Sequence, residues 1–328
     1  MKVLITGGAG FIGHHVVEHF IKNTDWDIAV LDKLNYASNG FDRLRDISCF
    51  AHDRISILAT DFCNPLPQGI KQELGKIDYI FHLGAETHVD NSIVDPMPFV
   101  YSNVVGTMHM LDYARSLKDL KLFVMFSTDE VFGPAPEGIF WKESDRYNCT
   151  NPYSATKAGA EQLAMAYANT YKLPIIVTNT MNVFGERQHS EKFIPNTIKK
   201  LLSGEKVIIH SDPSKTIAGS RHWVHARNVA AALLFLTNKF KAGERYNIIG
   251  DAEVDNLTIA RMLAKFLNKR LEYEMVDFHS TRPGHDLRYA LDGTKMKDMG
   301  WNLPVSFEKS FDNTIKWMIQ KEHIKWIL

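Results

Sequence analysis

Two acidic residues stand side by side in a segment that directly follows an apolar run. The segment is STDEVFG at residues 127–133, and the run before it, residues 122–126, is typical of a buried strand. Ligands of open α/β sheets bind at the C-terminal ends of parallel strands. If their surroundings push their pKa values apart there, Asp129 and Glu130 can act as a general acid and a general base. The alternative is a solvated acidic turn.

A tyrosine and a lysine, Tyr153 and Lys157, are spaced to share one face of a helix. Asn151 is a suitable cap for this helix, and Pro152 suits its first turn. An ammonium group beside a phenol favours the phenolate, so we expect Lys157 to lower the pKa of Tyr153 and make it a useful base. A surface tyrosine beside a surface lysine is the alternative. The nearby Thr128, at the end of the preceding strand, favours catalysis.

A glycine-rich turn, GGAGFIG at residues 7–13, follows the apolar run at residues 3–6. Glycines at these spacings allow a tight turn and close approach of a pyrophosphate, which the helix N-terminus then binds. Asp32 ends the next apolar run about 20 residues further on, where a carboxylate accepts the ribose hydroxyls of a dinucleotide. A plain turn with a surface aspartate is the alternative. Asp32 would repel a 2′-phosphate and so favours NAD over NADP, although Lys33 beside it weakens this preference.

The elements that must position these groups alternate along the chain. Six segments are apolar throughout, with helical patterns between them: residues 3–6, 28–31, 55–58, 79–82, 122–126 and 174–178. Strands of this kind, separated by helices, form parallel sheets that are covered on both faces. We therefore predict an α/β fold, a doubly wound parallel sheet of the Rossmann type.

Beyond Gly185 the segments become shorter and more polar, which indicates a smaller C-terminal lobe. We assign residues 1–181 to a Rossmann domain that binds NAD, with a return segment at about 222–247. The lobe then comprises residues 182–221 and 248–328.

The composition argues against several classes of function. Lys+Arg and Asp+Glu number 38 each, so no net field favours nucleic acid or an anionic membrane. The three cysteines form no disulfide framework, and the 14 histidines form no ligand-spaced set, so we expect no metal. No apolar run reaches the roughly 18 residues that a membrane span needs, and the N-terminus does not resemble a signal peptide. We predict a soluble cytoplasmic protein.

Together these motifs resemble the extended short-chain dehydrogenase/reductase family, and within it the dTDP-glucose 4,6-dehydratase group. The stretches that carry the resemblance span nearly the whole chain: residues 32–37, 82–90, 127–133, 151–157, 191–195 and 282–286. The Thr-Asp-Glu triplet at 128–130 distinguishes the dehydratase group from related epimerases and decarboxylases, which usually lack it. The resemblance implies NAD as cofactor, a nucleoside-diphosphate sugar as substrate, and a homodimer.

The resemblance also assigns site residues. The implied catalytic residues are Thr128, Asp129, Glu130, Tyr153 and Lys157. The positions that hold NAD in the family correspond to Gly7, Gly10, Phe11, Ile12, Gly13, Asp32, Lys33, Leu34, Asn35, Asp61, Phe62, Leu83, Ala85, Ser102, Tyr153 and Lys157. Those that hold the nucleotide sugar, which we place in the C-terminal lobe and cleft, correspond to Thr87, Thr128, Asn182, Glu191, Lys192, Arg221, Asn256, His285, Asp286, Arg288 and Tyr289. The guanidinium forks of Arg221 and Arg288 match phosphate oxygens.

The reaction implied is dehydration of an NDP-glucose, with dTDP- or UDP-glucose as substrate, to the 4-keto-6-deoxy sugar. Tyr153 would take the O4 proton, Glu130 the C5 proton, and Asp129 would protonate the departing C6 hydroxyl. A 4-epimerase or decarboxylase would leave the acidic pair unexplained, and a non-catalytic dinucleotide-binding regulator would not need Tyr153 with Lys157. Ile208 and His210 replace a Pro and a Tyr that the family typically carries near the base, and residues 211–220 include an insertion, so the base stays open.

Overall fold

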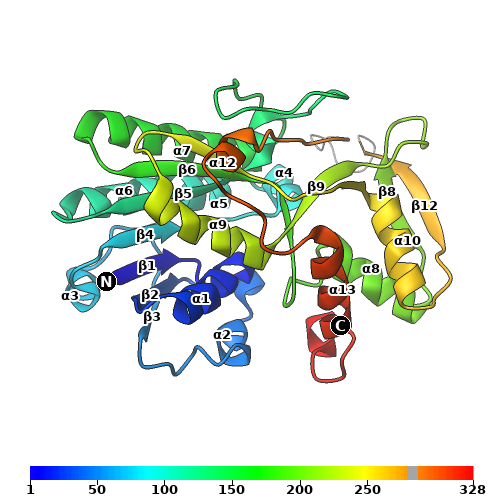
Figure 1. The fold of residues 1–328 in the computed structure, drawn as a ribbon, viewed down its shortest axis with the longest axis horizontal. Helices are drawn as coiled ribbons and strands as arrows, with labels where there is room; N and C mark the ends of the chain where they lie inside the picture. Colours follow the sequence, from blue (N-terminus) through cyan, green and yellow to red (C-terminus); the bar gives the residue numbers. More distant parts are fainter. Residues whose placement is uncertain (279–286, 328) are drawn as a thin grey trace.

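The computed structural model describes residues 1–278 and 287–327, and in this part of the chain the core is one sheet of seven parallel strands. Figure 1 shows this sheet, whose strand order is β10-β6-β5-β4-β1-β2-β3. The strands are β1 (Lys2–Thr6), β2 (Asp27–Asp32), β3 (Ile55–Ala59), β4 (Tyr79–His82), β5 (Leu122–Thr128), β6 (Ile175–Thr180) and β10 (Arg245–Ile248). Five of the six apolar runs lie within these strands and the sixth, residues 174–178, begins one residue before β6, so the predicted doubly wound α/β fold is confirmed.

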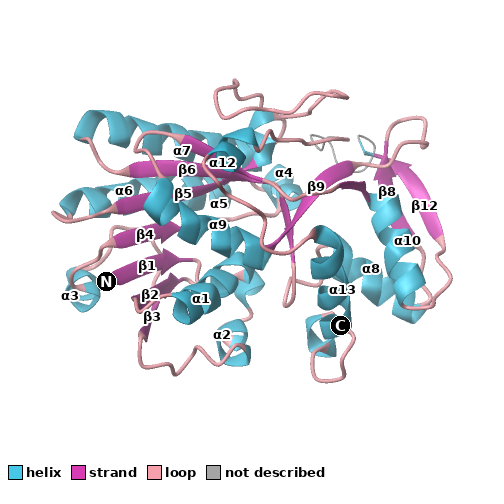
Figure 2. Cartoon of the chain, viewed as in Figure 1, coloured by secondary structure: helices cyan, strands magenta, loops and turns pink. Residues whose placement is uncertain are grey.

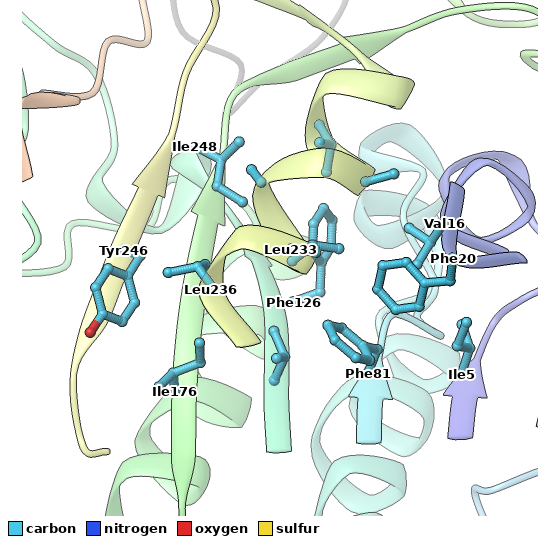
Figure 3. Close-up of a cluster of buried hydrophobic side chains, with 14 of the residues drawn as sticks. Ile5, Val16, Phe20, Phe81, Phe126, Ile176, Leu233, Leu236, Tyr246 and Ile248 are labelled. Carbon is cyan, nitrogen blue, oxygen red and sulfur yellow. The ribbon is translucent and has the colours of Figure 1, made fainter. Parts of the chain in front are cut away.

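Helices cover both faces of this sheet. Successive side chains of each strand point to opposite faces, so an apolar strand places side chains in the core on either side. Val3 and Ile5 pack with α1 (Phe11–Asn23) and α9 (Ala226–Lys239), whereas Leu4 packs on the other side. That second face is covered by α3 (Gln68–Leu74), α6 (Gly106–Ser116) and α7 (Pro152–Tyr171). Figure 3 shows the first face, where Phe20 of α1 and Leu233 of α9 lie over the sheet. Burying each such side chain stabilises the fold by about 1.5–3 kcal/mol.

The strand order reverses at β1, since β2 lies on one side of it and β4 on the other. Successive crossovers therefore leave this point in opposite directions and open a crevice at the C-terminal ends of β1 and β4, where open α/β sheets bind ligands. The glycine-rich turn follows β1, and residues 83–87 follow β4.

Two smaller sheets and several helices complete the described chain (Figure 2). One sheet holds β7 (Asn182–Phe184), β9 (Ser220–His225) and β11 (Glu253–Asp255), and the other pairs β8 (Val207–Ser211) with β12 (Tyr273–Asp277). Helices α8 (Phe193–Ser203), α10 (Asn256–Phe266) and α13 (Phe307–Met318) share a core with Phe184 and Trp223. The remaining helical segments are α2 (Asp42–Asp46), α4 (Val89–Val94), α5 (Met97–Phe99), α12 (Thr294–Asp298), η1 (Tyr36–Ser38), η2 (Val100–Val105), η3 (Asp129–Phe132) and η4 (Ile324–Trp326).

Within the described ranges, no helix is both long and apolar enough to cross a membrane. The same ranges contain no group of three or more His, Cys, Asp or Glu side chains arranged to hold a metal ion.

Candidate active site

The turn after β1 is built in a way that only glycine allows. Gly7 has a φ of +69°, and a Cβ on it would lie 2.7 Å from the Cα of Gly84, in the turn after β4. A Cβ on Gly13 would lie 2.0 Å from the carbonyl oxygen of Gly7. The first turn of α1 is thus pressed against the loop that precedes it, and Gly10 caps the helix without a side chain. The N-terminal N–H groups of α1 are left for an anion.

Asp32, at the end of β2, is tied to this turn. One carboxylate oxygen accepts the N–H of Ala9 at 3.0 Å, and the other accepts the N–H of Leu34 at 2.8 Å. Burial raises the pKa of Asp32, while these two hydrogen bonds oppose the rise. Each oxygen keeps a lone pair, so the carboxylate can accept two ribose hydroxyls from a fixed position.

One pocket at the crevice brings most of the predicted cofactor residues together. Those that line it are Gly7, Gly10, Phe11, Ile12, Gly13, Asp32, Lys33, Asn35, Phe62, Leu83, Ala85 and Ser102. Three predicted substrate residues, Thr87, Glu191 and Lys192, line the same pocket. Four predicted cofactor residues are not among its described lining residues, namely Leu34, Asp61, Tyr153 and Lys157. Leu34 supports Asp32, and the Asp61 carboxylate accepts the N–H of Cys63 at 2.8 Å.

The pocket also contains residues that the motifs did not single out. Glu86 binds Lys33 at 2.6 Å and accepts a hydrogen bond from Asn35 at 3.2 Å, so it fixes two predicted cofactor residues. Its position between Ala85 and Thr87 was the signal that could have identified it. The others are Tyr36, Ala37, Ser38, Arg43, Gly84, Gln188 and His189. Gln188 and His189 lie in a polar stretch after β7 and carry no motif that would have revealed them.

The acidic pair lies at the end of β5, where its two members occupy different surroundings. Asp129 is 3% exposed, whereas Glu130 is partly exposed and accepts a hydrogen bond from the Asn151 side chain at 3.0 Å. The Thr128 hydroxyl donates to Asp129 Oδ1 at 2.9 Å, while Oδ2 is buried without a hydrogen-bond partner in the described chain. Burial, together with the charge of Glu130, raises the pKa of Asp129 to about 7. The predicted division between an acid and a base therefore has a physical cause.

Helix α7 brings Tyr153 and Lys157 to the same strand end. Asn151 caps the helix by accepting the Ser154 N–H at 2.8 Å, and Pro152 stands in the first turn, as expected. Both functional side chains are buried.

The electrostatics of this pair differ from the expectation. Burial, and then the charge of Glu130, raise the pKa of Tyr153 well above its usual range, while the Thr128 hydroxyl opposes the rise. The Lys157 amine donates to the Phe126 carbonyl at 2.7 Å, and burial lowers its pKa to about 8. Burial is thus the largest influence on the pKa of Tyr153 in this structure, and a backbone oxygen binds the Lys157 amine that we expected to lower it.

The predicted substrate residues of the later chain gather around β9. Arg221 is buried above the ring of Tyr289, 4.5 Å from its centroid, and donates to the Leu287 carbonyl at 2.9 Å. Its charge lowers the pKa of Asp129, which places it near the acidic pair. Asn256 donates its N–H to the Gly219 carbonyl at 2.9 Å, and Asn182 pairs with Trp223 of β9.

Arg288 forms an ion pair and hydrogen bonds with other residues of the chain. Its guanidinium binds both carboxylate oxygens of Glu253, at 2.6 and 2.9 Å, and donates to the carbonyls of Pro136 and Ile139. A diphosphate would therefore have to compete with Glu253 for it. His285 and Asp286 lie outside the described residues.

The chain matches a known protein family and several known proteins over nearly its whole length. The family model for GDP-mannose 4,6 dehydratase matches residues 4–314. The dTDP-glucose 4,6-dehydratase of Escherichia coli is 37% identical over 97% of this chain and 93% of its own length. A trifunctional enzyme of Arabidopsis thaliana, whose name includes UDP-glucose 4,6-dehydratase, is 37% identical over 97% of this chain and 47% of its own length.

A solved structure agrees with these sequence relatives. The dTDP-glucose 4,6-dehydratase of Streptomyces venezuelae, whose crystal structure holds NAD, is 34% identical, with a TM-score of 0.89 over 99% of this chain and 98% of its own. The predicted family is therefore confirmed: the chain is an extended short-chain dehydrogenase/reductase and belongs to the GDP-mannose 4,6-dehydratase family.

Proposed function

We propose that this protein is an NAD-dependent nucleotide-sugar 4,6-dehydratase that converts an NDP-glucose to the NDP-4-keto-6-deoxy sugar and water. The observation that carries the proposal is the split acidic pair. A buried Asp129 with a pKa of about 7 stands beside a partly exposed Glu130, and both adjoin Tyr153. Elimination of water needs one acid and one base, and simple oxidation or epimerisation at C4 needs neither of these groups.

The residues of the pocket fit NAD. The glycine turn leaves room for a pyrophosphate against the N-terminus of α1, and Asp32 presents two fixed carboxylate oxygens to a ribose. Bound NAD would supply the hydride acceptor for C4 and the later hydride donor for C6. Glu86 holds Lys33 and Asn35 in place in the wall of the pocket.

The chain's own groups then move the protons. Tyr153 accepts the O4 proton, with Thr128 next to it as a hydrogen-bonding partner. Oxidation at C4 acidifies the C5–H bond, and Glu130 removes this proton. Asp129, which retains its own proton near neutral pH, donates it to the C6 hydroxyl so that water leaves. Asparagine or an ionised aspartate could not make this last transfer.

The substrate side of the cleft is where we place the nucleoside diphosphate. Arg221 lies beside the acidic pair, and Thr87, Glu191 and Lys192 line the pocket next to the cofactor residues. The relatives include enzymes named for dTDP-glucose and one named for UDP-glucose, so both sugars are candidate substrates.

We also propose that the protein is a cytoplasmic homodimer. Support for the dimer comes from apolar side chains left exposed between α4 and η2, where Val94 is 86% exposed and Met97 and Tyr101 are exposed as well. Size-exclusion chromatography with light scattering should give twice the mass of the chain. A Val94→Glu variant should then elute as a monomer.

The test of the function is direct. The purified protein is incubated separately with dTDP-glucose and UDP-glucose, and the products are analysed by mass spectrometry. A product lighter than its substrate by one water supports the proposal and identifies the base. An isomer of unchanged mass that separates from the substrate on chromatography would point to a 4-epimerase, and loss of carbon dioxide from UDP-glucuronic acid in a parallel incubation would point to a decarboxylase. No change with any substrate, despite bound NAD, would support a non-catalytic role.

A further inference from the structure

A buried carboxylate lies behind the proposed catalytic residues. Glu161 is 0% exposed and sits on α7 one helical turn beyond Lys157, on the same face of the helix. No motif pointed to it, and the mechanism above does not use it. An ionised carboxylate without partners would cost several kcal/mol at this depth, so its surroundings show what it does.

Polar groups from three other parts of the fold converge on this carboxylate. The Asn179 amide, on β6, donates to Glu161 Oε1 at 2.8 Å. Arg245 Nε, on β10, lies 3.7 Å from Oε2, and the Tyr147 hydroxyl donates to the same oxygen. The two hydrogen bonds and the charge of Arg245 favour the ionised carboxylate and oppose the effect of burial, which raises the pKa of Glu161.

The carboxylate is also linked to the reacting face. The Asn179 amide that binds Glu161 donates to the backbone carbonyl of Thr128 as well, at 3.1 Å. Thr128 in turn neighbours Tyr153 and hydrogen-bonds Asp129. Glu161 is thus two hydrogen bonds from the strand end that carries the proposed acid, and one helical turn from the proposed lysine.

We infer that Glu161 is a positioning residue for the proposed proton transfers: from behind the sheet edge it balances the charge of Lys157 and, through Asn179, holds Thr128 in place. The inference rests on the proposed function. Glu161 has no route to substrate, since its carboxylate is buried under Tyr147, Asn179 and Arg245.

The charges around these groups give the sign of the effect. Glu161 faces Tyr147 and Cys149 from the loop before α7, Arg245 from β10, and Tyr153 and Lys157 from its own helix. Lys157 also faces His82 of β4, and Tyr153 faces Asp129 and Glu130 of η3. The negative charge of Glu161 raises the pKa of both Lys157 and Tyr153. Removing this charge should lower the pKa of both groups.

The experiment compares pH profiles of turnover between pH 6 and 9.5 for the wild type and Glu161→Gln, which keeps the size of the side chain and removes its charge. We expect the whole profile of the variant to move to lower pH, with the loss greatest above pH 8, where Lys157 loses its proton. Glu161→Asp restores the charge and should return the profile toward that of the wild type. If Glu161→Gln lowers the maximal turnover but does not move the profile along the pH axis, the inference is overturned.

A matched control is Glu186→Gln, which alters another buried carboxylate that pairs with His225 at 3.0 Å, away from Lys157. It should leave the position of the profile unchanged even if it destabilises the protein. If Glu161→Gln does not fold, Tyr147→Phe removes one donor and raises the pKa of Glu161, so Glu161 loses its charge at low pH and the acid limb of the profile should move to lower pH; an unmoved acid limb would equally overturn the inference. A wild type that releases no water refutes the proposed function itself, whereas an unmoved profile in an active wild type refutes only the role of Glu161.

Discussion

Replacing Asp129 by asparagine should make the protein more stable and much less active. Folding raises the pKa of this carboxyl from 3.8 to about 7, so the folded protein binds the proton more tightly than the unfolded chain does. The stability that Asp129 contributes is therefore fully present below pH 3.8 and is lost as the pH rises through 7. Each pH unit between these two values corresponds to about 1.36 kcal/mol, so the loss at pH 8 is about 4 kcal/mol.

Asparagine is neutral at every pH and can still accept the hydrogen bond that Thr128 donates to Oδ1. We expect Asp129→Asn to exceed the free energy of unfolding of the wild type by about 1 kcal/mol at pH 4.5 and by about 4 kcal/mol at pH 8. The same variant lacks the proton for the C6 hydroxyl, so turnover should fall by roughly 10²–10⁴-fold.

Urea unfolding of the wild type and Asp129→Asn at half-unit steps from pH 4.5 to 8.5, followed by tryptophan fluorescence, measures this difference. Asp53→Asn, at an exposed position before β3, is the control for removing a carboxylate at the surface. Glu130→Gln removes the second cause of the raised pKa, so in that background the gain from Asp129→Asn should shrink. A gap that is absent, or that is constant with pH, would refute the assignment of Asp129 as a buried acid.

Three further substitutions test the other roles. Tyr153→Phe should lower turnover by roughly 10²–10⁴-fold with NAD still bound, and near wild-type turnover would exclude Tyr153 as the first base. Asp32→Asn should raise the Kd for NAD about 10–100-fold in a direct binding titration, because hydrogen bonds to charged groups contribute about 1.5–3 kcal/mol, and an unchanged Kd would contradict the cofactor pocket. Glu130→Gln should oxidise C4 but not eliminate water, so bound NADH should accumulate by absorbance while C5 hydrogen exchange with deuterated solvent disappears. Normal release of water by this last variant would place the base elsewhere.

Much of the fold could be predicted because local and tertiary preferences agree. The apolar runs of β1, β2 and β4 are buried on both faces of the sheet, so burial alone required them to be apolar throughout. The glycine turn was equally readable, since Gly7 and Gly13 sit where a Cβ would overlap backbone atoms. The motif residues of the site lie at strand ends that these same elements bring together.

The parts that could not be predicted depend on long-range contacts without a local pattern. Gln188 and His189 reach the pocket only because the chain after β7 passes beside it. Arg288 was expected to face a diphosphate, yet Glu253 of β11 binds it, and nothing in the spacing of these two residues signals that pair. Glu161 was missed for the same reason: Asn179 and Arg245, which bind its carboxylate, come from strands far along the chain.

Electrostatics illustrates this limit most clearly, since residue type sets the ordinary pKa and burial sets the actual one. Removing water disfavours every charged form, so it raises the pKa of an acid and lowers that of an amine. At the end of β5 the same cause therefore brings Asp129 up to about 7 and Lys157 down to about 8. A proton donor and a nearby cation then both titrate close to neutral pH, and a general acid is most effective when its pKa lies near the working pH. The sheet edge thus does more than gather the catalytic side chains: by excluding water from them it tunes two opposite kinds of group toward the same pH range.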